Sequence, residues 1–428
     1  MVLFIEYLIN FCYYAYGQSP SKSSFFEFSM FIRNLQLFIV VASCILVLIG
    51  TDILLPSLPH IAYSLSASSN EVKMLISIFM IGQFVTVLIW GIIADQLGRG
   101  KTLFLGMLIF FIGSILSLEA NSINFLLACR FLQGTGAVVV PVAGWALIQD
   151  LFPKDEGARI MTWIGTLTAV IPLFAPALGG KLDVLYGWRS NLYCIAFYSF
   201  ILCLMMMCLP KHPTMPKRLN LSLREKLHIY NRIVKNKTFI SYIALFGLLN
   251  CGEWCFLTVA PFYYSNANIA PDKMGILLMV TSMGFVCGSL LASRLFKQFG
   301  IDKIIALGIQ LALISSLMLL VGEYFHWSQH QFYNAVDIGI YILSSALLWG
   351  ATTSRALQCF DDYRGAASAV RSLILLCFAA FGTYSGRLVS HNSLYPVGLF
   401  LFFMALITLI IFNNKELKTE RLSGEAAI

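Results

Sequence analysis

Ionisable side chains that lie inside apolar stretches are the first candidates for chemistry in this sequence of 428 residues. Asp52, Arg130 and Glu253 each lie within an apolar run long enough to cross a membrane as a helix. An ionisable group in such a run is costly and usually faces a partner group or a water-filled space. A carboxyl group favours its neutral form in a low dielectric and its ionised form beside water or a guanidinium. The two acids and the arginine are therefore candidates for binding and releasing a proton.

A charged, glycine-rich segment follows the second apolar run and reads Gly91-Ile-Ile-Ala-Asp95-Gln-Leu-Gly98-Arg99-Gly-Lys101. The glycines permit a tight turn and a close approach of two helices. The Asp95 carboxylate can accept hydrogen bonds from the amides of a helix N-terminus or pair with a guanidinium. We predict that this segment forms a contact that one conformation of the protein makes and another breaks.

Two further motifs lie in the fourth and fifth apolar runs. They read Arg130-Phe-Leu-Gln133-Gly134-Thr-Gly136 and Pro172-Leu-Phe-Ala175-Pro176-Ala-Leu-Gly179-Gly180. Glycine permits close contact between helices, and proline restricts the helix backbone. Because these residues fix backbone geometry, we expect both motifs to set how neighbouring helices pack.

The amino-acid composition indicates that most of this chain is surrounded by lipid. Hydrophobic residues make up 58% of the chain and charged residues 12%, and the mean hydropathy is +0.79. A soluble globular protein carries roughly 25% charged residues, so this chain cannot cover its surface with solvated side chains. These values exclude a soluble enzyme, a nucleic-acid-binding module and a disordered tail. The net charge of +8 is spread between apolar runs and forms no nucleic-acid-binding cluster.

Twelve apolar runs are long enough to cross a bilayer core, which is about 30 Å thick and needs about 20 helical residues. The predicted spans are Leu37–Leu55, Met74–Ala94, Thr102–Leu118, Ile123–Ile148, Ile160–Leu178, Asn191–Leu209, Phe239–Tyr264, Met274–Phe296, Ile304–Val321, Val336–Thr353, Ala366–Tyr384 and Leu394–Phe412. Asp337 lies at a predicted span end, where we expect it to be solvated. Arg371 lies near another, where we expect its side chain to extend towards the membrane surface or to have a function.

The distribution of Lys and Arg predicts the orientation of these spans. One side, formed by the N-terminus, the even-to-odd loops and the C-terminus, carries 22 Lys and Arg residues. The loops of the opposite side carry five, which are Lys73, Lys181, Arg189, Lys273 and Arg387. Because cytoplasmic loops are enriched in Lys and Arg, we predict that both termini are cytoplasmic.

The sequence aligns with itself at an offset of 202 residues, which indicates a duplication of six spans. The matched pairs are Gly50 with Gly252, Pro59 with Pro261, Gly82 with Gly284, Gly98 with Gly300, Lys101 with Lys303 and Gly106 with Gly308. In the same register Glu253 matches Thr51, beside Asp52, so we expect the two acids to face one cavity from opposite halves. Counting the helical rise places both acids and Arg130 in the outer half of the bilayer.

These features divide the chain into five parts. Residues 1–35 form an N-terminal extension, residues 36–210 and 238–413 form two six-helix halves, residues 211–237 form a basic cytoplasmic linker, and residues 414–428 form a cytoplasmic tail. The extension is either an interfacial helix or a mis-assigned start, with Met30 as the native first residue. In the linker, Ser222 and Glu225 have capping-box spacing, which predicts a short amphipathic helix against anionic lipid.

Two pseudo-symmetric six-helix halves joined by a linker resemble the major facilitator fold, whose substrate site lies between the halves. The Gly91 segment matches the loop signature of that superfamily at every fixed position. The Arg130 segment is similar to its RxxxGxG motif. The Pro172 segment resembles its antiporter motif, with Ala175 where a glycine often precedes the proline.

A narrower resemblance is to the Bcr/CflA (bicyclomycin and chloramphenicol resistance) branch of drug:proton antiporters. In that branch an acidic residue precedes a Leu-Pro-x-Leu-Pro turn, as it does in Gly50-Thr-Asp52-Ile-Leu-Leu-Pro56-Ser-Leu-Pro59. The resemblance extends from about Leu37 to Lys211 and is weaker in the second half. It implies proton-coupled efflux of small hydrophobic drugs or drug-like metabolites across the bacterial inner membrane, by alternating access.

Within that framework we predict that Asp52 binds the proton in competition with substrate, that Arg130 modulates it, and that Glu253 is available for cationic substrates. We expect a monomer in contact with membrane lipid, no enzymatic activity, no nucleic-acid partner, and no metal or other cofactor, because the proton gradient supplies the energy. The alternatives are a proton-coupled uptake symporter, a dedicated exporter of one endogenous metabolite such as a siderophore, and a membrane-embedded enzyme or scaffold. The sequence contains no nucleotide-binding, HExxH or GxSxG motif that would support the membrane-embedded enzyme.

Overall fold

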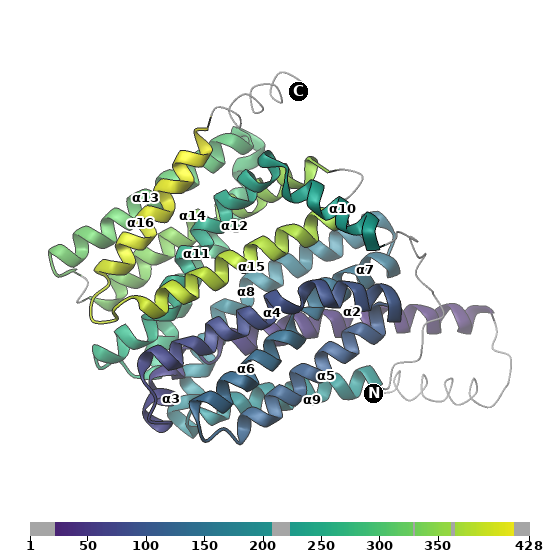
Figure 1. The fold of residues 1–428 in the computed structure, drawn as a ribbon, viewed down its shortest axis with the longest axis horizontal. Helices are drawn as coiled ribbons and strands as arrows, with labels where there is room; N and C mark the ends of the chain where they lie inside the picture. The colour runs from purple at the N-terminus through teal and green to yellow at the C-terminus, as the bar shows by residue number, and fades with distance from the viewer. Residues whose placement is uncertain (1–21, 208–222, 328–329, 361–363, 415–428) are drawn as a thin grey trace.

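The computed structural model describes residues 22–207, 223–327, 330–360 and 364–414, which form helices joined by short turns (Figure 1). Twelve helices among these residues are long and apolar enough to cross a membrane, as the sequence predicts. A helix hydrogen-bonds its own backbone groups, which is what a lipid solvent requires of a spanning segment. The chain is therefore built as a bundle of membrane helices.

The first half contains α2 (Lys22–Asp52), η1 (Leu55–Ser57), α3 (Leu58–Ser64), α4 (Ser69–Leu97), α5 (Arg99–Leu118), α6 (Ile123–Ala137), η2 (Val140–Gly144), α7 (Trp145–Leu151), α8 (Lys154–Tyr186) and α9 (Arg189–Met207). After α10 (Leu223–Val234), the second half contains α11 (Lys237–Asn266), α12 (Pro271–Phe299), α13 (Ile301–Tyr324), α14 (Gln331–Gln358), α15 (Arg364–Leu388) and α16 (Tyr395–Phe412). The short element η1 is a 3₁₀ turn, and η2 is a π-helical turn.

Local signals in the sequence fix several helix ends. Ser68 and Glu71 form a capping box at the start of α4, in which the Ser68 amide donates to Glu71 Oε2 at 2.8 Å. Gly98 and Gly300 separate α4 from α5 and α12 from α13, with φ angles of +89° and +78°. Glycine reaches these angles without the steric cost that a side chain adds. Both halves therefore reverse direction with an equivalent one-residue turn.

The two halves are visible as separate groups of helices, and two helix pairs make most of the contact between them (Figure 1). In the first half α6 packs against α4 and α5, and α2 packs against α8 and α9. In the second half α14 packs against α11, α12 and α13. The halves meet where α8 packs against α12 and where α4 packs against α15. We call the end of the bundle at which α10, Gly98 and Gly300 lie the linker end, and the opposite end, at which α3 lies, the α3 end.

The internal duplication is visible in the helix boundaries. Helix α4 covers residues 69–97 and α12 covers residues 271–299, which is the register that the sequence predicts. Gly82 of α4 packs on a carbonyl of α6, and Gly284 of α12 packs in the same way on a carbonyl of α14. The register does not continue without a gap, however, because α14 begins at Gln331 instead of at 325. The single offset of 202 residues therefore fails beyond α13, where the second half has a longer connection.

Several sequence predictions concern residues outside the described part of the chain. These are the first 21 residues of the predicted extension, residues 211–222 of the linker including Ser222, and residues 415–428 of the tail. Helix α10 lies where the sequence predicts a short linker helix, and it packs against α11 and α15. Its contact with lipid stays a prediction.

Candidate functional site

Asp52 is the last residue of α2 and lies directly before the break formed by η1. Pro56 in η1 has no amide hydrogen with which to continue the helix. The Asp52 residue is 7% exposed, and no residue in the described part of the chain donates a hydrogen bond to its carboxylate. A buried carboxyl group at a break in a membrane helix is a functional candidate, because its protonation depends on what surrounds it.

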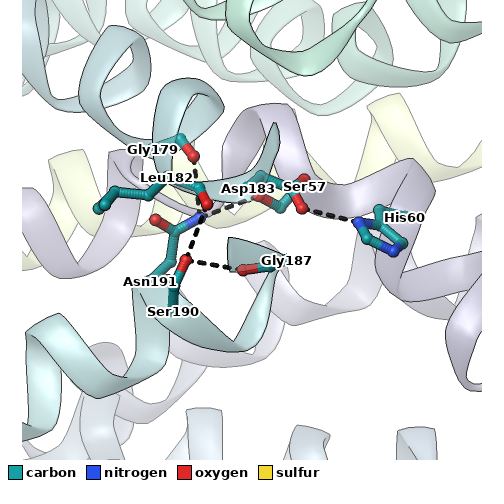
Figure 2. A network of polar contacts seen from close by, with 8 residues as sticks. All are labelled: Ser57, His60, Gly179, Leu182, Asp183, Gly187, Ser190 and Asn191. Carbon is teal, nitrogen blue, oxygen red and sulfur yellow. Dashed lines mark hydrogen bonds and ion pairs between the residues drawn. The ribbon is translucent and has the colours of Figure 1, made fainter. Parts of the chain in front are cut away.

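A polar network fixes the turn that follows α2 (Figure 2). Asn191 Nδ2 donates to Ser57 Oγ at 2.9 Å and to the carbonyl oxygen of Gly179 at 3.2 Å. His60 Nδ1 lies 2.7 Å from Oδ1 of Asp183, whose side chain is fully buried. Ser57 and His60 belong to η1 and α3, whereas their partners belong to α8 and α9. These contacts therefore hold the turn in place against the rest of the first half.

Arg130 lies in α6, is 1% exposed, and has its guanidinium satisfied by the first half itself. Its Nη1 donates to the carbonyl of Gly50 and to Gln133 Oε1, each at 2.9 Å. Its Nε donates to the carbonyl of Leu75 at 3.4 Å. The guanidinium carbon also lies 4.5 Å from the centroid of the Phe79 ring, in a cation–π contact. Arg130 therefore connects α2, α4 and α6 close to the end of α2.

The structure brings the three ionisable residues of the sequence prediction together. The Asp52 carboxylate lies within electrostatic range of both Arg130 and Glu253. Glu253 lies on α11 in the second half and accepts a hydrogen bond from Asn250 Nδ2 at 3.3 Å. Two acids from opposite halves therefore share one region, with the positive charge of Arg130 on the first-half side.

Replacing Arg130 is expected to destabilise the first half. Arg130→Met leaves buried acceptors without a donor, at a cost of roughly 1–3 kcal/mol for each. Arg130→Lys keeps the charge and can keep one of the hydrogen bonds, so its loss should be smaller. Thermal unfolding midpoints of the purified proteins in detergent should fall in the order wild type, Arg130→Lys, Arg130→Met. A midpoint of Arg130→Met equal to that of the wild type would contradict the structural role.

The sequence motifs do not point to Tyr341, which the structure places beside Glu253. Tyr341 is fully buried on α14, and its hydroxyl fills the space left by Gly252 on α11. It lies within electrostatic range of Glu253, and its hydroxyl has no hydrogen-bond partner among the described residues. The one signal in the sequence is that Tyr341 follows Asp337 by about one helical turn. Residues that only pack in a helix bundle show the same spacing, so this signal does not identify a functional residue.

Asp337 lies deeper in the bundle than the sequence predicts. Helix α14 begins at Gln331, so Asp337 stands more than one turn inside it, and the residue is 1% exposed. Neither of its carboxylate oxygens has a hydrogen-bond partner in the part of the chain that the structure describes. The expectation of a solvated carboxylate is therefore wrong. Hydropathy places the start of this span too late, because the first turns of α14 are polar yet helical.

The glycines of the α6 motif hold Arg130 in position by close packing. A Cβ atom on Gly134 would collide with the carbonyl oxygen of Phe79 on α4. A Cβ atom on Gly136 would collide with the carbonyl oxygen of Gly106 on α5. The motif therefore packs α6 against both neighbours with no space between the backbones, which fixes the depth and direction of the guanidinium.

The Gly91–Lys101 segment lies at the linker end, where Arg99 joins two carboxylates of the first half. Arg99 Nη2 lies 3.9 Å from Asp95 Oδ1, and Arg99 Nε lies 3.5 Å from Asp150 Oδ2 on α7. Lys101 is exposed, and a Cβ atom on Gly91 would meet no other atom within 4 Å. The sequence motif predicts the partner Asp95, but Asp150 is found only in the structure. Making and breaking of this contact stays a prediction.

The motif residues Pro172, Pro176, Gly179 and Gly180 lie in α8, which borders the second half. A Cβ atom on Gly180 would collide with the carbonyl oxygen of Pro271 at the start of α12. From the other side, a Cβ atom on Gly275 would collide with the carbonyl oxygen of Pro176. Gly179 packs in the same way on the carbonyl of Ile53, directly after Asp52. This motif therefore connects the Asp52 turn to the contact between the halves.

Lys73 is a second link between the halves and is fully buried in α4. Its Nζ donates to the carbonyls of Gly386 and Val389 at the end of α15, at 3.3 and 3.1 Å. The carbonyl groups at a helix C-terminus carry a partial negative charge, which stabilises a cation there. Burial, followed by the Lys73 charge, lowers the pKa of His391 in the adjacent turn. The expectation that Lys73 lies in a loop is wrong, because α4 begins before it. Lys73 holds the halves together at the α3 end.

Comparison with known proteins agrees with this architecture. Residues 40–381 match the model of the Major Facilitator Superfamily. A bicyclomycin resistance protein homolog of Haemophilus influenzae is 26% identical, over 84% of this chain and 90% of the relative. The multidrug resistance protein MdtL of Vibrio parahaemolyticus is 24% identical, over 77% of this chain and 83% of the relative.

Solved structures show the same fold. A D-xylose-proton symporter matches with a TM-score of 0.67 and 15% identity, over 87% of this chain and 96% of that structure. The nucleoside transporter NupG matches with a TM-score of 0.69 and 14% identity, over 89% of this chain and 98% of that structure. This chain belongs to the Major Facilitator Superfamily and is a multi-pass membrane transporter, not an enzyme.

Proposed function

We propose that this protein exports small hydrophobic drugs or drug-like metabolites by alternating access, in exchange for protons. The observation that carries the proposal is the pair of acids, buried Asp52 from the first half and half-buried Glu253 from the second, beside the buried Arg130 guanidinium. Rocking of one half against the other changes the distance between these groups and their access to water. Since protonation of a carboxyl group depends on both, the same movement can load a proton on one side and release it on the other.

The direction of transport rests on other observations. The relatives named for bicyclomycin and multidrug resistance support export, and so does the proline- and glycine-rich motif of α8 at the contact between the halves. The fold by itself is compatible with uptake, because one of the matched structures is a proton symporter. Uptake by symport, and export of a single endogenous metabolite such as a siderophore, are therefore the alternatives that the experiment must separate.

The bacterial relatives and the charge distribution support a place for this protein in the bacterial inner membrane. Because Lys73 is buried in α4, the loops at the α3 end carry even less exposed positive charge than the sequence count implies. This supports a cytoplasmic linker end with both termini on that side. The halves then contact each other at the periplasmic end. We propose that the working unit is a monomer surrounded by lipid. We also propose that its chain consists of the extension, two six-helix halves, linker and tail that the sequence predicts.

A proton-release assay in everted membrane vesicles tests the proposed function. The vesicle lumen is acidified, and a panel of antibiotics and cationic, neutral and anionic dyes is added while the luminal pH is followed. Export predicts that at least several unrelated compounds release luminal protons. A response to one metabolite alone would support a dedicated exporter. Proton-driven accumulation in right-side-out vesicles, without release in everted ones, would support uptake.

A further inference from the structure

Arg371 of α15 is a buried positive charge that has no counter-ion among the residues that the structure describes. The residue is 8% exposed, its Nη2 is buried without a partner, and no described residue pairs with its guanidinium or accepts a hydrogen bond from it. Arg130, an arginine deep within another predicted span, has three acceptors. A buried charge without a counter-ion is unfavourable in protein and in lipid. Arg371 is therefore placed to take a counter-ion from outside the chain, and it does not extend to the membrane surface.

An aromatic platform surrounds this guanidinium. The Arg371 guanidinium carbon lies 4.5 Å from the centroid of the Trp349 ring. Phe246 and Phe285 pack against Trp349 at centroid distances of 4.8 and 6.5 Å, with interplanar angles of 78° and 69°. Trp349 nevertheless remains 39% exposed. One large ring therefore carries a cation, is held by two further rings, and keeps part of its surface free for another planar group.

The position of Trp349 shows which way this free surface faces. Trp349 lies on α14, and its contacts Phe285 and Arg371 lie on α12 and α15. These two helices make most of the contact between the second half and the first half, and α11 also touches η1, α3 and α4. A ring that touches both lies on the side of α14 that faces the first half. Counting the helical rise places Arg371 and Trp349 about 10 and 14 Å from the linker ends of their helices.

The platform and Glu253 lie on one side of the second half at different depths. Phe246, Asn250 and Glu253 follow one another on α11 at the spacing that places residues on one helix face. The seven residue steps from Phe246 to Glu253 correspond to about 10 Å along the helix. A molecule between the halves therefore meets the acids towards the α3 end and the guanidinium with its indole towards the linker end.

We propose that Arg371 and Trp349 form a subsite for a planar aromatic anion, whose carboxylate pairs with the guanidinium while its ring stacks on the indole. A guanidinium binds a carboxylate through two parallel hydrogen bonds, and aromatic rings stack in offset geometry. Asp52 and Glu253, when ionised, repel an anion, so the acidic group of the substrate points towards the linker end. This inference rests on the proposed function and names the substrate class: small aromatic compounds that carry an acidic group.

Equilibrium binding of two matched probes tests this subsite without requiring transport. Purified protein in lipid nanodiscs is titrated with 2-naphthoate and with the neutral 2-naphthamide at neutral pH. A charge-assisted pair predicts that the wild type binds the naphthoate roughly tenfold to hundredfold more tightly. Arg371→Gln is expected to bind the two probes with equal affinity. Arg371→Lys keeps a charge but loses the planar stacking, so its preference should be intermediate.

Arg355→Gln provides the matched control, because Arg355 is a second-half arginine already paired with Asp302 at 3.2 Å. It should keep the preference for the anion, and Asp52→Asn should keep it as well. Equal binding of both probes to the wild type, or an undiminished preference in Arg371→Gln, would overturn the subsite. If the subsite holds while everted vesicles release no protons, it is the proposed function that fails.

Discussion

Asp52→Asn is expected to abolish substrate-driven proton release while the variant still binds substrate. The amide has nearly the same shape as the carboxyl group but cannot take up or release a proton. Coupling between two ligands is typically 1–3 kcal/mol, or roughly 5–150-fold in affinity. In the wild type, substrate affinity should therefore change by about that factor across the pH range in which the acids titrate. In Asp52→Asn that change should disappear.

Two measurements check this result in the same preparation. Everted vesicles report proton release, and substrate binding to purified protein between pH 5 and 9 reports the coupling. Asp337→Asn is the comparison, since Asp337 is a buried acid of the second half without a described hydrogen-bond partner, outside the Asp52 cluster. It should keep both the release and the pH dependence. Full proton-driven efflux by Asp52→Asn, or loss of coupling in Asp337→Asn alone, would refute the assignment of Asp52.

Gly180→Ala is expected to reduce transport by about tenfold without unfolding the protein. The new methyl group would collide with the carbonyl oxygen of Pro271, which belongs to the other half. Overpacking of this kind costs typically 1–3 kcal/mol. That cost falls on the conformation in which the halves touch at the α3 end, and not on one in which they separate there. The population should therefore shift towards opening at the α3 end, which slows the transport cycle.

Gly165→Ala is the matched control on the same helix, because a Cβ atom there would meet nothing within 4 Å. The readout is labelling of a cysteine introduced at the α3 end with a membrane-impermeant reagent, alongside vesicle transport. Gly180→Ala should label faster than the wild type, and Gly165→Ala should match it. Equal labelling in all three proteins, with normal transport in Gly180→Ala, would show that the α8–α12 contact does not control access.

The sequence alone predicts much of the architecture because the lipid solvent leaves few choices. Apolar runs of sufficient length have to be helices, and the scarcity of charge reduces the candidate site to a few residues. The capping box at Ser68 and the positive φ angles of Gly98 and Gly300 are local features, so their positions are legible in the chain. The Asp52 turn and the glycine motifs of α6 and α8 are identifiable for the same reason.

Other properties depend on which helices lie side by side, and the sequence does not contain that information in a readable form. The sequence predicts that Lys73 lies in a loop, yet its side chain donates to carbonyls more than 300 residues away in the chain. The sequence predicts that Asp337 lies at the end of a span and is solvated, yet the residue is buried. Hydropathy averages over a window, so it reports the solvent of a segment and not the surroundings of one side chain.

Arg130 and Arg371, which lie well inside predicted spans, show the difference most clearly. Both are equally anomalous in the sequence, since each is a single cation in an apolar run. The sequence by itself determined the fold family, the membrane setting and the short set of ionisable residues that belong to its interior. Only the tertiary structure decided that Arg130 is satisfied by its own half, whereas Arg371 finds no acceptor among the described residues. Whether a buried charge has a partner is a property of the space around it, and the packing of several helices creates that space.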